Sequence, residues 1–106
     1  MIEFILMKKT KLLLGSIASD LYRVAMFAHR KSHKAAARFL QEAHRWRKDV
    51  KDDSIKPYIR KLLGELDTYK SYQPDRLDIA EKYLMFSVIL QNYTLHMSDG
   101  VNAKLH

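Results

Sequence analysis

Apolar residues recur at steps of three and four along the first half of the chain, and this period constrains the fold more than any other feature. Such steps place the apolar side chains on one face of an α-helix, whereas a β-strand would need strict alternation. No alternating run rich in Val, Ile and Thr occurs elsewhere in the sequence. The sequence therefore predicts an all-α protein. The periodic positions are Leu14, Ile17, Ala18, Leu21, Ala25, Ala28, Ala35, Phe39, Ala43, Trp46 and Val50.

The boundary between the first two helices falls in residues 30–34, a polar segment without Gly or Pro. One unbroken helix from about residue 8 to 51 would be about 65 Å long, which is long beside a compact domain of this size. Compactness favours a tight turn near Ser32, which could cap the second helix. A continuous helix also fits the sequence, because the apolar phase does not slip at this point.

Capping residues set the other boundaries. Asp52-Asp53-Ser54 offers N-caps for a third helix, and Pro57 is tolerated in the first turn of that helix. Pro74 can open the last helix, and Ser98-Asp99-Gly100 can end it. We therefore predict one helical domain over residues 1–106, with helices at about 8–30, 33–51, 55–70 and 75–97. The predicted architecture is a small antiparallel four-helix bundle.

Composition narrows the class of protein. The chain is 47% hydrophobic, with 3 Gly and 2 Pro, which is typical of a folded helical domain. It has no cysteine, which excludes disulfides and Cys-based metal sites and fits a cytoplasmic location. The longest uncharged run, residues 83–97, is shorter than the roughly 18 apolar residues that a membrane span needs. We expect a cytoplasmic protein with no transmembrane segment and no cofactor.

Positive charge is concentrated in the first half of the chain. Residues 1–51 contain 12 Lys and Arg against 4 Asp and Glu, while residues 52–106 contain 7 against 8. On a helix, six of these cations fall on the side opposite the apolar face, with Gln41 in line. Such a stripe can neutralise phosphates of a nucleic acid. It could also bind an acidic protein or an anionic lipid headgroup, or it could be an ordinary solvated surface. The six are Arg23, Arg30, Lys34, Arg38, Arg45 and Lys48.

Metal binding and catalysis have little support. His29 and His33 are four residues apart, but no carboxylate or cysteine is spaced to complete a metal site, so none is expected. Two Arg-x5-His pairs, beginning at Arg23 and Arg38, have the spacing found in HEPN ribonuclease-like helical bundles, which this chain resembles in size. The polar residue that follows the arginine in that family is absent from both pairs. We therefore do not carry its activity over, and we expect no enzyme.

The last helix is apolar on two opposite sides. One stripe is Leu77, Ala80, Leu84, Val88 and Leu95, and a second lies about 180° away. Because a helix of a small bundle normally buries one face, the second stripe indicates an interface with another copy or with a partner subunit. A last helix embedded in the bundle and flanked by the long first helix would also explain two apolar sides. We assign that interface to Ile79, Tyr83, Phe86, Leu90 and Tyr93.

Two functions remain compatible with the sequence. The first is a small basic protein that binds the RNA or DNA backbone without catalysis and is itself oligomeric. The second is an interaction subunit that docks through its last helix and recognises an acidic partner. Charge alone does not separate the two.

Overall fold

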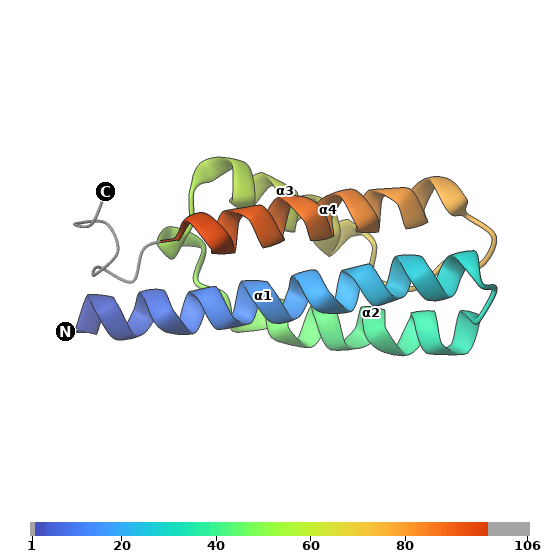
Figure 1. The fold of residues 1–106 in the computed structure, drawn as a ribbon, viewed down its shortest axis with the longest axis horizontal. Helices are drawn as coiled ribbons and strands as arrows, with labels where there is room; N and C mark the ends of the chain where they lie inside the picture. The colour runs from blue at the N-terminus through green and yellow to red at the C-terminus, as the bar shows by residue number, and fades with distance from the viewer. Residues whose placement is uncertain (1, 98–106) are drawn as a thin grey trace.

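The computed structural model describes residues 2–97, with side chains from residue 5 onward, and contains four α-helices and one short 3-10 turn. Successive helices run in opposite directions (Figure 1), which confirms the predicted all-α antiparallel bundle. None of the helices in residues 2–97 has the length and apolar character needed to cross a membrane. The elements are α1 (Ile2–His29), α2 (His33–Lys48), η1 (Asp52–Ser54), α3 (Pro57–Thr68) and α4 (Leu77–His96).

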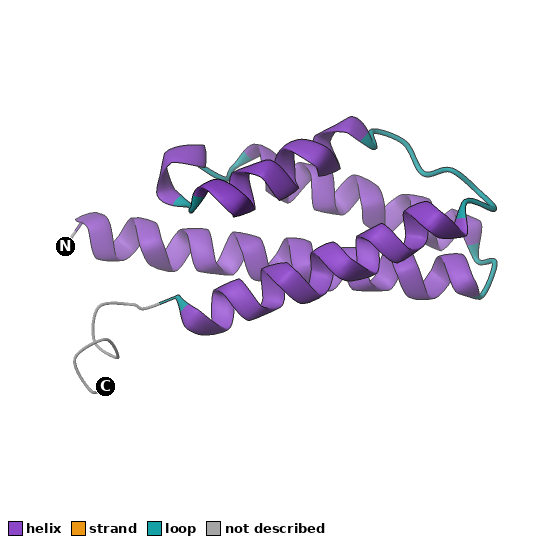
Figure 2. Cartoon of the chain, turned by 90° about the horizontal axis from the view of Figure 1, so that it is seen from above, coloured by secondary structure: helices purple, strands orange, loops and turns teal. Residues whose placement is uncertain are grey.

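The four helices pack around one shared core. The long helix α1 packs against both α2 and α4. Figures 1 and 2 together show α1 and α4 side by side on the front of the bundle, with α2 and α3 behind them. The apolar faces of all four helices meet in one core cluster. Its fully buried side chains include Leu14, Ile17, Leu21, Leu40, Ile59, Leu63, Leu66, Tyr83, Phe86 and Leu90.

A tight turn separates α1 from α2, so the open question at Ser32 is resolved in favour of two helices. The Ser32 amide donates to the Phe27 carbonyl at 2.8 Å, and the Lys31 amide donates to the Ala28 carbonyl at 3.0 Å. These two bonds form a Schellman motif, which requires its C′ residue to be left-handed. That residue is Lys31, with a φ of 59°. Ser32 is the N-cap residue of α2 but makes no side-chain capping bond.

Replacing Lys31 with glycine should stabilise the protein by about 0.5–1 kcal/mol. A lysine pays a steric cost in the left-handed region that glycine avoids, and the greater freedom of glycine in the unfolded chain offsets only part of the gain. The matched control is Arg38→Gly, which lies in the interior of α2 and should cost about 1 kcal/mol. Urea unfolding measures both changes. A loss of stability in Lys31→Gly would contradict the role given to this turn.

Three predicted helix starts differ from the structure. The first helix begins at Ile2 and not near residue 8. The third begins at Pro57, because Pro57 keeps Lys56 extended and the predicted caps at 52–54 form the 3-10 turn. The last begins at Leu77, because Asp75 is left-handed with a φ of 65° and cannot be helical. The predicted stop at Ser98-Asp99-Gly100 lies outside the described residues.

Candidate polyanion-binding face

The outer side of α2 carries a row of cations. The inner side of this helix buries Ala36, Leu40 and Ala43. The opposite side exposes Lys34, Arg38, Gln41, Arg45 and Lys48 to solvent. We call its four cations, Lys34, Arg38, Arg45 and Lys48, the basic face. It extends about 21 Å along the helix at 1.5 Å per residue.

The two edges of α2 explain why the basic face points outward. On one edge, the Phe39 ring stacks on Phe27 of α1, with ring centroids 5.6 Å apart. On the other edge, the His44 Nε2–H donates to the Tyr69 carbonyl at 2.8 Å, and His33 Nδ1 lies 2.8 Å from the Tyr72 hydroxyl. These contacts hold α2 to α1 and to the segment after α3. The helix therefore cannot rotate its cations toward the core.

Three of the four cations are free to accept an anionic ligand. The side chains of Lys34, Arg38 and Lys48 make no hydrogen bond or ion pair with any residue from 5 to 97. Arg45 donates to Glu42 Oε2 at 2.7 Å, and its guanidinium lies 5.4 Å from the Trp46 ring centroid. An exposed pair of this kind contributes only about 0–1 kcal/mol, so a phosphate can compete for Arg45.

The two remaining predicted cations lie on α1 and in the turn, beyond the basic face. Arg23 donates to Asp20 Oδ1 at 3.3 Å, and its guanidinium lies 5.4 Å from the Phe39 ring centroid. Burial raises the pKa of the Asp20 carboxyl, and the nearby Arg23 charge offsets this only in part. Arg30 is exposed in the turn. Because the chain reverses at Lys31, the six cations do not form the single straight stripe that a continuous helix would give.

Two shallow hollows border the basic face and add cations that the sequence did not indicate. One is lined by Lys31, Lys34 and Arg38, and the other by Arg45, Lys48 and Lys70 among others. Lys31 lies beside the basic face because the chain reverses at this residue. Lys70 comes from the segment after α3, so no periodicity within α2 could have found it. Both side chains are exposed and enlarge the positive surface.

Two of the histidines, His33 and His44, have structural partners in other elements. Residues 2–97 contain no group of three or more His, Asp or Glu side chains placed to hold a metal ion. The turn at Lys31 separates His29 from His33, so their spacing no longer places both imidazoles on one helix face. His33 and His44 instead hold the segment after α3 against α2.

The structure contradicts the interface that the sequence predicted on α4. Ile79, Tyr83, Phe86 and Leu90 are buried inside the single chain. The fifth residue, Tyr93, is half-buried and packs edge-on against Tyr58. Burial raises the pKa of the Tyr83 phenol to about 12, as expected for a hydroxyl without solvent. This side of α4 faces the core, so a second chain cannot dock on it.

The opposite stripe of α4 is the more exposed one. Leu77, Val88 and Leu95 are 51%, 53% and 68% exposed, although Ala80 from the same stripe is buried. Both stripes have helical spacing and similar apolar content. Only the positions of α1 and α3 around α4 decide which one is covered.

Comparison of the chain with protein-family models, with curated proteins and with solved structures found no match.

Proposed function

We propose that this protein binds the phosphate backbone of RNA or DNA through the basic face. The observation that carries the proposal is a row of exposed cations on one rigid helix, three of them without an acidic partner among the described residues. Ordinary solvated surfaces mix the two signs of charge, which lowers their attraction for polyanions. Among residues 5–97, the only acid that pairs with the basic face is Glu42, at its edge.

The same face is poorly suited to reading bases. The uncharged hydrogen-bonding side chain that lies in line with these cations is Gln41, and the nearby rings of Phe39 and Trp46 are half-buried against the core. Phosphate contacts position a protein on nucleic acid but carry no sequence information. We therefore expect binding that depends on salt and varies little with sequence.

The test is a variant that loses the three unpaired cations, Lys34→Gln, Arg38→Gln and Lys48→Gln. Four phosphate contacts predict that the parent loses about 50- to 150-fold in affinity between 50 and 200 mM salt, and one remaining contact predicts about threefold. Fluorescence anisotropy with labelled single-stranded RNA and duplex DNA measures both proteins. Circular dichroism should be unchanged, because the three side chains make no contact that holds the fold.

A matched control removes the same number of charges elsewhere. Lys9, Lys56 and Lys61 are exposed and lie off α2, so their change to Gln should leave the salt dependence close to that of the parent. An equal loss in this control would show that net charge, and not the basic face, drives binding. The proposal fails if the parent binds neither nucleic acid at 50 mM salt. It also fails if the parent retains an acidic protein that bulk RNA does not displace.

A further inference from the structure

The two large aromatic rings of α2 already have partners within the chain. Phe39 stacks on Phe27 of α1, with the two ring planes 2° apart, and the guanidinium of Arg23 lies 5.4 Å from the Phe39 ring centroid. The guanidinium of Arg45 lies over the Trp46 ring at the same distance from its centroid. Both rings are half-buried. An unpaired base would have to displace one of these partners in order to stack on α2.

Two tyrosines in the segment after α3 lie beside α2 and are held in a similar way. Tyr69 packs edge-on against the buried Tyr83, with ring centroids 5.9 Å apart. The Tyr72 ring lies 5.7 Å from the His33 ring, and its hydroxyl lies 2.8 Å from His33 Nδ1. Both tyrosines are half-buried. The rings that border the basic face are therefore engaged by the fold.

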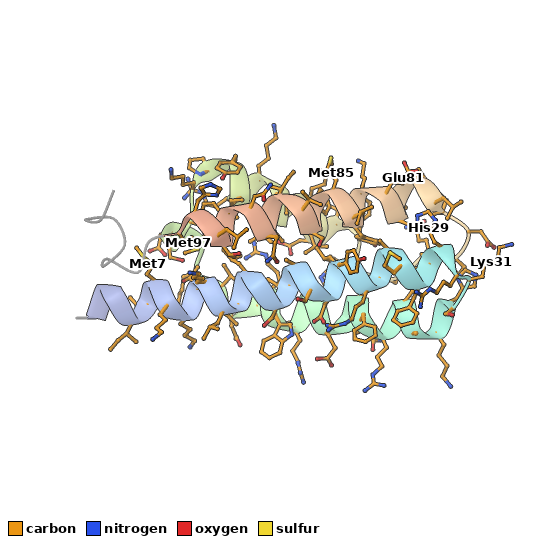
Figure 3. The ribbon with its side chains drawn as sticks, in the orientation of Figure 1. Met7, His29, Lys31, Glu81, Met85 and Met97 are labelled. Atoms are coloured by element: carbon orange, nitrogen blue, oxygen red, sulfur yellow. The ribbon has the colours of Figure 1, made fainter. Side chains whose placement is uncertain are left out.

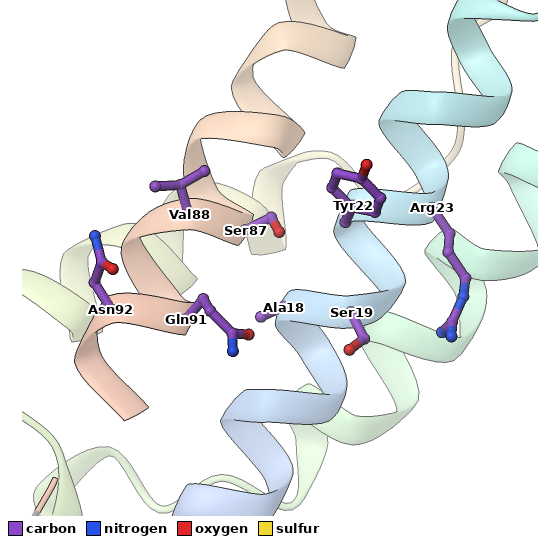
Figure 4. Close-up of a pocket in the computed structure, with 8 residues that line it drawn as sticks. All are labelled: Ala18, Ser19, Tyr22, Arg23, Ser87, Val88, Gln91 and Asn92. Carbon is purple, nitrogen blue, oxygen red and sulfur yellow. The ribbon is translucent and has the colours of Figure 1, made fainter. Parts of the chain in front are cut away.

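The exposed aromatic side chains lie elsewhere in the molecule. Among residues 5–97 they are Tyr22 and Tyr58, which are 49% and 55% exposed. Tyr22 lines a groove between α1 and α4 (Figure 4), and Tyr58 packs edge-on against Tyr93 of α4. Neither ring lies on α2. A strand bound along the basic face would therefore find no exposed ring on which to stack its bases.

The basic face offers charge instead. Lys31 at the turn end of the bundle (Figure 3) and Lys70 after α3 add to it through the two hollows. The acids nearest to these cations in sequence or in the hollows are Glu42, Asp49 and Asp67, and both Glu42 and Asp67 are paired with an arginine. Five cations make no hydrogen bond or ion pair with residues 5–97. They are Lys31, Lys34, Arg38, Lys48 and Lys70.

A surface that offers only charge favours the polyanion with the higher density of phosphates. A DNA duplex carries one negative charge per about 1.7 Å of its axis, whereas each strand by itself contributes one per about 3.4 Å. Proteins that bind single strands commonly supplement charge with base stacking on aromatic side chains. The basic face lacks that contribution, so it favours the duplex.

The rigidity of α2 acts in the same direction. The cations lie along one straight helix that is fixed to α1 and to the segment after α3. A duplex is stiff over about 150 base pairs, so it presents its phosphates to such a surface without further ordering. A flexible single strand must lose conformational freedom to follow the same surface.

We infer that the basic face binds double-stranded nucleic acid in preference to single strands, through phosphate contacts alone. This inference rests on the proposed function, because it names the form of nucleic acid that the same face binds. Duplex DNA and duplex RNA share the chemistry that carries it, namely two phosphate backbones whose bases are already stacked.

The test compares one strand of about 25 nucleotides, free and annealed to its complement, in a DNA version and an RNA version. Fluorescence anisotropy with the unaltered protein at 50 mM salt measures the four affinities. We expect a duplex to bind at least about tenfold more tightly than its own labelled strand. If only one of the two duplexes shows this preference, that duplex is the ligand.

A second variant adds the ring that the basic face lacks. Gln41 is exposed in line with the cations, so Gln41→Tyr places a stacking surface among them. It should tighten single-strand binding about fivefold or more and narrow the preference for the duplex. The matched control is Gln91→Tyr, which adds the same ring on α4, away from the basic face. It should leave single-strand binding as in the parent, and circular dichroism should be unchanged in both variants.

The outcomes separate this inference from the proposed function. If the parent binds neither form at 50 mM salt, the proposed function fails and the inference fails with it. If single strands bind as tightly as both duplexes or more tightly, the inference alone is overturned and binding through the basic face stands. The inference is also overturned if Gln41→Tyr tightens duplex binding as much as single-strand binding, or if Gln91→Tyr has the same effect as Gln41→Tyr.

Discussion

Changing Phe86 to alanine is expected to lower the free energy of unfolding by about 3–5 kcal/mol. Phe86 is 2% exposed and belongs to the core cluster, so its removal leaves a cavity that the neighbouring helices fill only in part. The neighbouring Met85 is 50% exposed, and Met85→Ala should change stability by less than about 0.5 kcal/mol. Urea unfolding monitored by circular dichroism measures both variants.

Protein concentration separates the two possible roles of Phe86. Loss of a core side chain destabilises each chain by the same amount at every protein concentration. Loss of an interface side chain instead acts by shifting the equilibrium between monomer and dimer. We expect the Phe86→Ala loss to be equal in a dilute sample and in one a hundred times more concentrated. A loss that disappears in the dilute sample would return Phe86 to the interface that the sequence suggested.

Changing Arg47 to methionine should cost about 2–4 kcal/mol. Arg47 Nε and Nη2 donate to the two Asp67 carboxylate oxygens, both at 3.2 Å, and Nη1 donates to Asp52 Oδ1 at 2.9 Å. Its side chain is only 14% exposed, so the bonds to Asp67 are partly shielded from water, whereas the bond to Asp52 is exposed. Both carboxylates are about half exposed and can regain hydration, which keeps the cost below that of a fully buried pair.

Lys48→Met is the matched control for Arg47, because Lys48 is the next residue and makes no hydrogen bond or ion pair with residues 5–97. It should change stability by less than about 0.5 kcal/mol. A double-mutant cycle of Arg47→Met with Asp67→Asn should give a coupling free energy of at least about 1 kcal/mol. If Arg47→Met is as stable as Lys48→Met, the contacts of Arg47 with Asp67 of α3 contribute nothing to the free energy of unfolding.

The helices and their directions could be predicted because they depend on local patterns. The period from Leu14 to Val50 correctly placed Ala43 and Val50 in the core and the basic face on the outer side of α2. It missed the buried Ala36 and Leu40, and the predicted Ala35, Phe39 and Trp46 are only half-buried. The polar segment around Ser32 allowed a turn, and the turn formed although a left-handed Lys31 is unfavourable. Packing of α2 against α1 must offset that cost, which a local pattern cannot reveal.

The buried side of α4 could not be predicted, because two apolar stripes on one helix are locally equivalent. Tyr83 and Phe86 are covered, and Val88 is exposed, only because of where α1 and α3 lie. Arg47 was also missed, since its partners Asp52 and Asp67 lie in other elements. The predicted cations on α2 share one face as expected. The positions of Arg23 and Arg30 relative to that face could not be predicted without knowing where the chain turns. Binding by these residues stays a prediction.

The pairing of α1 with α4 also sets an order of events during synthesis. The ribosome completes α1 at His29, but its partner α4 is finished only 67 residues later, at His96. At about 5–20 residues per second, this delay is about 3–13 s. The hairpin of α1 and α2 can form earlier, yet Leu14, Leu21 and Ala25 cannot be covered by α4 during that interval. The nascent chain therefore exposes its longest apolar helix until the last described helix emerges, and in that period it is most open to chaperones and to aggregation.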